Sequence, residues 1–317
     1  MRGLVGPVVG ALACGAVLAW SAGSGYAEGL VALGATYSLL ALGMWVPFVL
    51  GGSLSMAYSV YLAVGGYVVG FGILELGWPL LPCLLVGIVI AVLVAVALGA
   101  ATRRLSGFYL AAVTLLAAAA FEAWLLDATG LTGGSTGLRG IPLTAIGSLE
   151  ITRWGLLVTA VVLTWVVAVL FDRLRSSNFG VALRAQRHVP AAVQASGIGT
   201  QALSLVGQGL GAAVAALGGA FFAAINSGVG PETFTPNLVF LAIFMPLIGG
   251  VRTAWGAVLG AALVVVLTVY VHLPGDAGSL VLSLAALVIL LLWPNGLLGQ
   301  LRAGVDRLSN TLRGGAS

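Results

Sequence analysis

The sequence predicts an all-α protein that crosses a membrane many times. Of its 317 residues, 60% are hydrophobic and only 7% are charged, with a mean hydropathy of +1.14. A soluble domain carries about 25% charged residues, so this composition does not cover a water-facing surface. Long apolar runs and arginines gathered in alternate loops give the same indication. The basic charge balance therefore indicates a membrane topology and no nucleic-acid partner.

Ten segments approach the roughly 20-residue apolar length of a membrane-spanning helix. The segment 237–250 is short and is broken by Pro246 and Gly249, so a half-helix or a re-entrant turn is expected there. Arg2 and the apolar run after it also fit a signal peptide, but we expect a retained first helix because the topology then closes consistently. The ten segments are 4–21, 29–50, 56–76, 79–101, 108–128, 154–172, 203–225, 237–250, 254–273 and 278–293.

The arginines test this topology. With the N-terminus in the cytoplasm, the outer loops receive only Arg139 and Arg153. Cytoplasmic loops of membrane proteins carry an excess of basic residues, so the bias supports ten helices with both termini inside. The inner loops receive the other arginines: Arg2, Arg103, Arg104, Arg173, Arg175, Arg184, Arg187, Arg252, Arg302, Arg307 and Arg313.

Two loops stand out by length, one outside at 129–153 and one inside at 173–202. Each half of the chain holds five predicted helices, and odd-numbered halves predict inverted repeats. The glycine-rich segments 49–67 and 247–263 are candidate counterparts in the two halves. Similarity at this level also arises from the abundance of glycine and alanine, and the two interpretations stay open.

The residues offer little catalytic chemistry. The stretch GLTGGSTGLRGIP at 130–142 lacks the lysine of a phosphate-binding P-loop. His188 and His272 are predicted on opposite sides of the membrane, so no metal site is expected. Cys14 and Cys83 lie inside apolar runs, where free cysteine behaves as a small hydrophobe. We therefore expect no enzyme and no cofactor on this chain.

Glu122 is the main candidate for a charged side chain within the membrane. Such residues usually have a function, so Glu122 either lines a path or lies at the outer interface. A carrier driven by protons or sodium would need a row of buried carboxylates. The alternatives of a secondary transporter and of a membrane assembly protein therefore have less support than a transporter that receives its energy elsewhere.

The inner loop 173–202 indicates where that energy enters. The stretch after Pro190 predicts a short amphipathic helix that ends at Gly197. Ala191, Ala192 and Ala195 would give it a surface of small residues that fits a groove on another protein. An ordinary basic inner loop explains the composition equally well.

Several segments in order resemble one transporter family. The segment 50–67 matches a family signature at Ser55, Gly66 and Tyr67, and SGFYLAAVTL at 106–115 matches at six positions that include Tyr109 and Thr114. Residues 130–142, 179–198, 247–261 and 293–299 resemble its other signatures. Over roughly residues 29–300 the chain resembles the permease subunits of ATP-binding-cassette (ABC) importers of the branched-chain amino-acid family, the Liv-M type in particular. His188 and Val189 stand where the family usually has acids, and Ala119 replaces a carboxylate.

The resemblance implies an ABC importer permease fold in one domain, 1–317, in a bacterial cytoplasmic membrane. Two cytoplasmic ATPase subunits would carry ATP and Mg²⁺, an extracytoplasmic binding protein would deliver substrate, and a Liv-H-like subunit or a second copy would complete the path. The expected substrate is a branched-chain or other aliphatic amino acid, with urea or short amides as the alternative.

Site residues follow from the same resemblance. The inner loop would couple to the ATPases through Arg184, Arg187, Pro190, Ala191, Ala192 and Gly197. The outer loop would form a gate, a docking surface or a purely structural re-entrant loop with Thr132, Gly133, Gly134, Ser135, Gly137 and Pro142. Candidates for lining the path are Ser55, Tyr67, Tyr109, Thr114 and Glu122.

Overall fold

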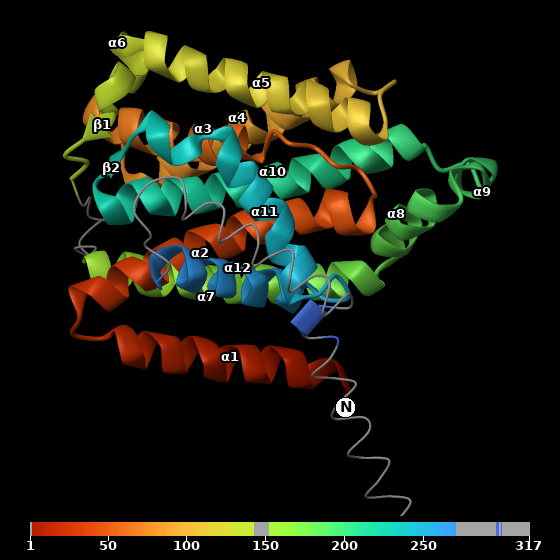
Figure 1. Cartoon of the computed structure of the whole chain (residues 1–317), viewed down its shortest axis with the longest axis horizontal. Coiled ribbons are helices and arrows are strands. Elements are labelled where there is room, and N and C mark those ends of the chain that lie inside the picture. The colour runs from red at the N-terminus through yellow and green to blue at the C-terminus, as the bar shows by residue number, and fades with distance from the viewer. Residues whose placement is uncertain (1, 143–151, 271–295, 298, 300–317) are drawn as a thin grey trace, which may run out of the picture.

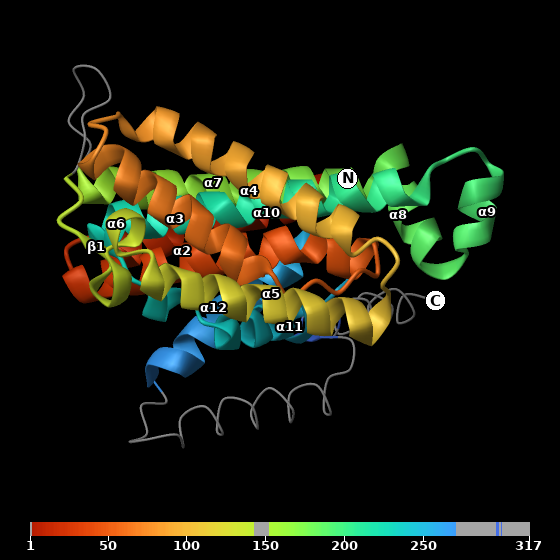
Figure 2. The same cartoon turned by 90° about the horizontal axis from the view of Figure 1, so that it is seen from above.

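The computed structural model describes residues 2–142, 152–270, 296, 297 and 299. Long helices lie side by side in a bundle (Figures 1 and 2). In Figure 1, α1 and α5 lie at opposite edges of the bundle, and α2 and α10 lie between them. Two short strands lie at one end, and α8 and α9 project from the other. We call these the hairpin end and the α8–α9 end.

The first half contains the helices α1 (Arg2–Ser21), α2 (Gly25–Trp45), α3 (Tyr58–Leu74), α4 (Leu80–Ala101) and α5 (Gly107–Asp127). α2 continues into η1, a π-helix at Val46–Leu50. Pro47 lies at the start of η1, where its ring and missing N–H disturb regular α-helical bonding. The chain then runs without helix from Gly51 to Ala57. The α2 span therefore ends in an irregular segment, which we call the 51–57 segment.

The hairpin end is a compact loop after α5. It contains α6 (Thr129–Thr132), the 3-10 helix η2 (Gly134–Thr136) and β1 (Leu138–Arg139). β1 pairs antiparallel with β2 (Gly228–Val229), which follows α10. The loop after α5 is therefore joined to the loop after α10 by a two-residue ladder. The rest of the predicted outer loop, 143–151, lies outside the described residues.

The second half begins with α7 (Arg153–Ser176), followed by α8 (Asn178–His188), α9 (Pro190–Ala195) and α10 (Thr200–Asn226). After β2 and the 3-10 helix η3 (Pro231–Phe234) come α11 (Pro236–Gly249) and α12 (Ala254–Tyr270). α11 and α12 diverge by 120° at the turn between them. That bend agrees with the predicted break at Pro246 and Gly249.

Glycines let the central helices approach closely. A Cβ added to Gly65 of α3 would collide with the Ala216 carbonyl of α10, and one added to Gly219 would collide with the Leu62 carbonyl. Small residues at helix crossings allow such backbone contact inside membranes, where the hydrophobic effect does not drive helices together. The buried core accordingly lies among α2, α3 and α10.

The prediction of an all-α membrane protein is confirmed. The described residues include five helices that are long and apolar enough to cross a membrane, or six if the α11–α12 pair counts as one span. In the described part of the chain, nine of the ten predicted segments are helical, but α3, with 17 residues, is shorter than a full span. The tenth segment, 278–293, lies outside the described residues. Ten spans and inverted repeats therefore stay predictions.

Candidate functional site

The α8–α9 end is built from two short helices with distinct local signals. The Ser177 hydroxyl caps α8 by accepting a hydrogen bond from the Gly180 N–H at 3.3 Å. Pro190 opens α9, where its missing N–H costs nothing. α9 was predicted, whereas α8 was missed because its polar sequence follows directly on the apolar run of α7.

Gly197 ends α9 as predicted. Its φ is +82°, in the region that favours glycine. The Ile198 N–H donates to the Val193 carbonyl at 3.3 Å, and the Gly197 N–H donates to the Gln194 carbonyl at 3.0 Å. This is the Schellman pattern of a helix C-terminus. Gly197 therefore has a structural role whether or not it touches a partner.

The small residues of α9 form its outer surface. Pro190, Ala191 and Ala192 are exposed, while Val193 is buried against the rest of the chain. Figure 2 shows α9 projecting beyond the ends of the long helices. The arrangement presents a small-residue surface away from the bundle, as a docking helix requires.

The two predicted coupling arginines turn back toward the chain. Arg184 donates to the carbonyls of Gly180 at 3.3 Å and Arg175 at 3.2 Å, within its own loop. Arg187 donates to the Val49 carbonyl of η1 at 2.7 Å, across 138 residues of sequence. Its side chain also packs on Gly52, where an added Cβ would lie 2.7 Å from the Arg187 Cγ. Arg187 therefore ties α8 to the end of the α2 span.

Two of the candidate path residues meet at the 51–57 segment. The Thr114 hydroxyl accepts a hydrogen bond from the Met56 N–H at 2.8 Å and donates to the Leu110 carbonyl at 2.7 Å. Ser55 lies next to Met56 and is buried. Irregular backbone within a membrane is tolerated where the protein satisfies it, and Thr114 of α5 does so here.

The other three candidates do not gather there. Tyr67 lies toward the hairpin end, with its ring 5.9 Å from that of Phe234. Tyr109 is 72% exposed at the start of α5. Glu122 is half-buried in the last turns of α5. The structure thus brings together only Ser55 and Thr114 of the five.

Three buried polar atoms of α3 have no hydrogen-bond partner in the described part of the chain. They are the hydroxyls of Tyr58, Ser59 and Tyr67. An unpaired buried polar group costs about 1–3 kcal/mol of folding free energy. These three hydroxyls are therefore candidates for a role other than stabilising the fold. Tyr58 and Ser59 were missed from the sequence, where they read as ordinary residues of an apolar helix.

The predicted outer loop residues form the hairpin end. The Thr132 hydroxyl donates to the Leu125 carbonyl at 2.6 Å and accepts from the Gly134 N–H at 3.2 Å. Gly137 has a φ of +65°, and a Cβ there would collide with the Val229 carbonyl of β2. The remaining residues of the set are Gly133, which ends α6, and Ser135 and Pro142, which are exposed.

Comparison with known proteins identifies the class. The long apolar helices define a multi-pass membrane protein. The profile described as "Branched-chain amino acid transport system / permease component" matches residues 26–292, and the chain belongs to this family. It is therefore a permease subunit of an ABC transporter and not an enzyme.

The curated relatives agree. The chain is 30% identical over 308 residues to the high-affinity branched-chain amino acid transport system permease protein LivM of Salmonella typhimurium, covering 88% of this chain and 71% of the relative. It is 28% identical over 305 residues to LivM of Escherichia coli, with the same coverage. A probable LivM of Methanocaldococcus jannaschii is 27% identical over 73% of the chain and 66% of the relative. No solved structure matches significantly.

The described residues contain no group of three or more His, Cys, Asp or Glu side chains that could hold a metal ion.

Proposed function

We propose that this chain is the permease subunit through which an ATP-driven importer carries branched-chain amino acids into the cytoplasm. The family description and the names of the curated relatives support this substrate. The long apolar helices carry few charged side chains, which suits a small aliphatic solute.

One contact carries the coupling mechanism: the 2.7 Å hydrogen bond from Arg187 to the Val49 carbonyl. We place the α8–α9 end in the cytoplasm, as the arginine distribution predicts, with α9 in a groove of the ATPase. ATP-driven movement of α9 is then passed by α8 and Arg187 to the 51–57 segment. The Met56 N–H of that segment is bonded to the Thr114 hydroxyl of α5. A movement of the segment therefore acts on both α2 and α5.

The partners follow from this arrangement. Two ATPase subunits bind the α8–α9 ends of two permease subunits, and a binding protein delivers substrate at the hairpin end. The second permease, a Liv-H-like chain or another copy, packs against α4 and α5. Only 28% of the apolar stretch of each of these helices is buried within the chain, against 72% for α2 and 78% for α10.

Uptake of labelled leucine tests the substrate. Vesicles with this chain, its partner subunits and the binding protein should accumulate leucine only with ATP, and an ATPase partner unable to hydrolyse ATP should stop it. Unlabelled valine should compete, while urea and acetamide should not. ATP-dependent uptake of urea or acetamide without leucine uptake would refute the proposed substrate. No ATP-dependent uptake of any of them would count against the importer.

A further inference from the structure

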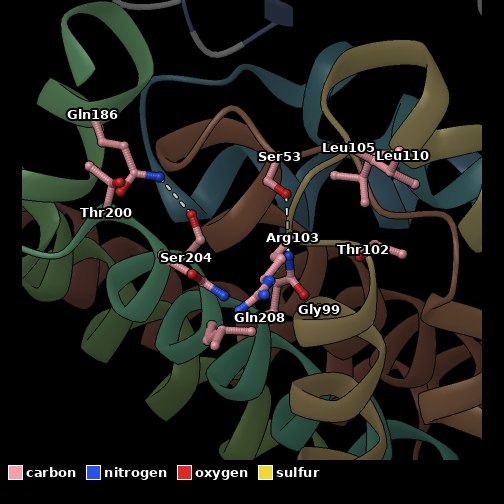
Figure 3. Close-up of a pocket in the computed structure, with 12 residues that line it drawn as sticks. Ser53, Gly99, Thr102, Arg103, Leu105, Leu110, Gln186, Thr200, Ser204 and Gln208 are labelled. Atoms are coloured by element: carbon pink, nitrogen blue, oxygen red, sulfur yellow. Dashed lines mark hydrogen bonds between the residues drawn. The ribbon is translucent and has the colours of Figure 1, made fainter. Parts of the chain in front are cut away.

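A cavity of about 210 Å³ lies at the α8–α9 end (Figure 3). Its lining comes from parts far apart in the sequence: the 51–57 segment, the connection between α4 and α5, α8, and the first turns of α10. Figure 3 shows Ser53, Arg103, Ser204 and Gln208 near its middle. Drug-sized sites occupy roughly 300–1,000 Å³, so this one suits a smaller solute.

Amide groups give the cavity fixed hydrogen-bonding positions. Gln208 is 7% exposed, and its Nε2 donates to the Ser53 hydroxyl at 3.3 Å. The Nε2 of Gln186 donates to the Ser204 hydroxyl at 2.6 Å. The Gln186 Oε1 is buried without a hydrogen-bond partner among the described residues. A buried acceptor without a donor is costly, so a ligand that brings an N–H group to it gains affinity.

The cavity lining also carries a positive charge, which favours a ligand with an anionic group. Arg103 is the one charged residue among the described residues that line the cavity. Arg103 is exposed, and its side chain makes no hydrogen bond or ion pair with other described residues. A guanidinium binds a carboxylate through paired N–H groups. The residues that line the cavity thus include one cation, Arg103, and one residue with an unpaired buried acceptor, Gln186.

We propose that this cavity binds an α-amino acid from the α8–α9 side. The carboxylate bonds Arg103, the ammonium donates to the Gln186 Oε1, and an aliphatic side chain packs on Leu105 and Leu205, which also line the cavity. Inorganic phosphate and a lipid phosphate fit less well. Inorganic phosphate brings no aliphatic group for Leu105 and Leu205, and a lipid is much bulkier than this cavity.

The site has a regulatory consequence, which rests on the proposed function because it needs this end to face the cytoplasm. Gln186 belongs to α8, whereas Arg103 and Gln208 belong to the bundle. A bound amino acid therefore ties α8 to the bundle, next to the Arg187 contact that passes movement to α2. Imported amino acid that accumulates in the cytoplasm should then slow further import.

Equilibrium binding tests the site itself. We would measure labelled leucine binding to the purified transporter complex without the binding protein, for wild type, Arg103→Gln and Arg104→Gln. Loss of the charge-assisted bond should weaken binding about tenfold in Arg103→Gln. The adjacent Arg104 does not line the cavity, so its variant should bind as wild type. Leucinol lacks the carboxylate and 4-methylpentanoate lacks the ammonium, and each should compete at least about tenfold less well than leucine.

Equal binding in Arg103→Gln, equal loss in Arg104→Gln, or displacement by phosphate as effective as by leucine would overturn the site. The second variant, Gln186→Leu, guards against a folding defect of the first: it should also weaken leucine binding while its complex stays assembled. Unchanged binding in Gln186→Leu would overturn the ammonium contact and with it the proposal.

A transport measurement distinguishes failure of this inference from failure of the proposed function. Vesicles preloaded with leucine on the ATPase side should take up external labelled leucine several-fold more slowly than empty ones, and Arg103→Gln should reduce that ratio. Normal ATP-driven uptake that is insensitive to internal leucine would overturn the regulatory inference alone. No ATP-driven leucine uptake by wild type would overturn both.

Discussion

At the hairpin end, hydrogen bonds inside the loop and the β1–β2 ladder fix the chain, whereas at the α8–α9 end Arg187 reaches a distant element and one buried acceptor stays unpaired. Thr132 bonds the backbone on both sides of itself, and β1 is fixed to β2 by its ladder. Arg187 instead reaches the Val49 carbonyl, and the Gln186 oxygen has no partner among the described residues. The difference teaches that the more conspicuous sequence, the glycine-rich loop, is largely explained by its own fold, while the arginine-bearing loop holds bonding capacity for other molecules.

The largest expected effect is at α9. Ala192→Trp adds bulk to an exposed position with no described structural role for its side chain. We expect loss of ATPase subunits from a pull-down on the tagged chain, and leucine uptake at background. Ser135→Trp, at an exposed position of the hairpin end, is the matched control and should keep the ATPases. Full association and uptake in Ala192→Trp would remove α9 from the docking surface.

Gly197 is a less informative position for this test. Gly197→Arg would also disrupt α9, but the φ of +82° at Gly197 makes any side chain strained there. Such a variant would unravel the end of α9 and lose the ATPase for two reasons at once. Ala192→Trp instead changes the exposed surface of α9 without straining the backbone at its end.

The sequence predicted the long helices well and the site poorly, for a physical reason. A run of about 20 apolar residues has few alternatives in a membrane, so 108–128 became Gly107–Asp127 and 203–225 became Thr200–Asn226. The helix α8 carries no apolar run, and only Ser177 marks its start. The cavity joins Ser53, Arg103 and Gln208, whose proximity depends on how helices rotate and pack, which composition does not determine.

A second experiment measures the rigidity of the hairpin end. Gly137 and Gly140 both have positive φ, but a Cβ at Gly137 would collide with β2 while one at Gly140 would meet open space. The ψ of −172° at Gly137 adds a conformation that is nearly exclusive to glycine. We expect Gly137→Ala to lower the free energy of unfolding by roughly 3 kcal/mol and Gly140→Ala by about 1 kcal/mol.

Thermal unfolding of the purified chain in detergent would compare these two variants. Because both variants place a side chain at positive φ, the difference between them reports the contact with β2 together with the extra backbone strain at Gly137. Equal unfolding temperatures would mean that the β1–β2 ladder does not hold the hairpin end in place, and the contrast between the two ends of the bundle would be lost.

The smallest expected effect, and the most specific one, concerns Arg187. Arg187→Gln removes the charged donor to the Val49 carbonyl without touching the exposed surface of α9. A hydrogen bond to a charged group contributes about 1.5–3 kcal/mol, so leucine uptake should fall about tenfold while the ATPase subunits stay bound. Arg184→Gln, which loses bonds only within the α7–α8 loop, should have a weaker effect. If both variants keep wild-type uptake per ATP hydrolysed, movement of α8 does not reach α2 through this contact, and coupling must pass through the packing of α8 against α7 and α10 instead.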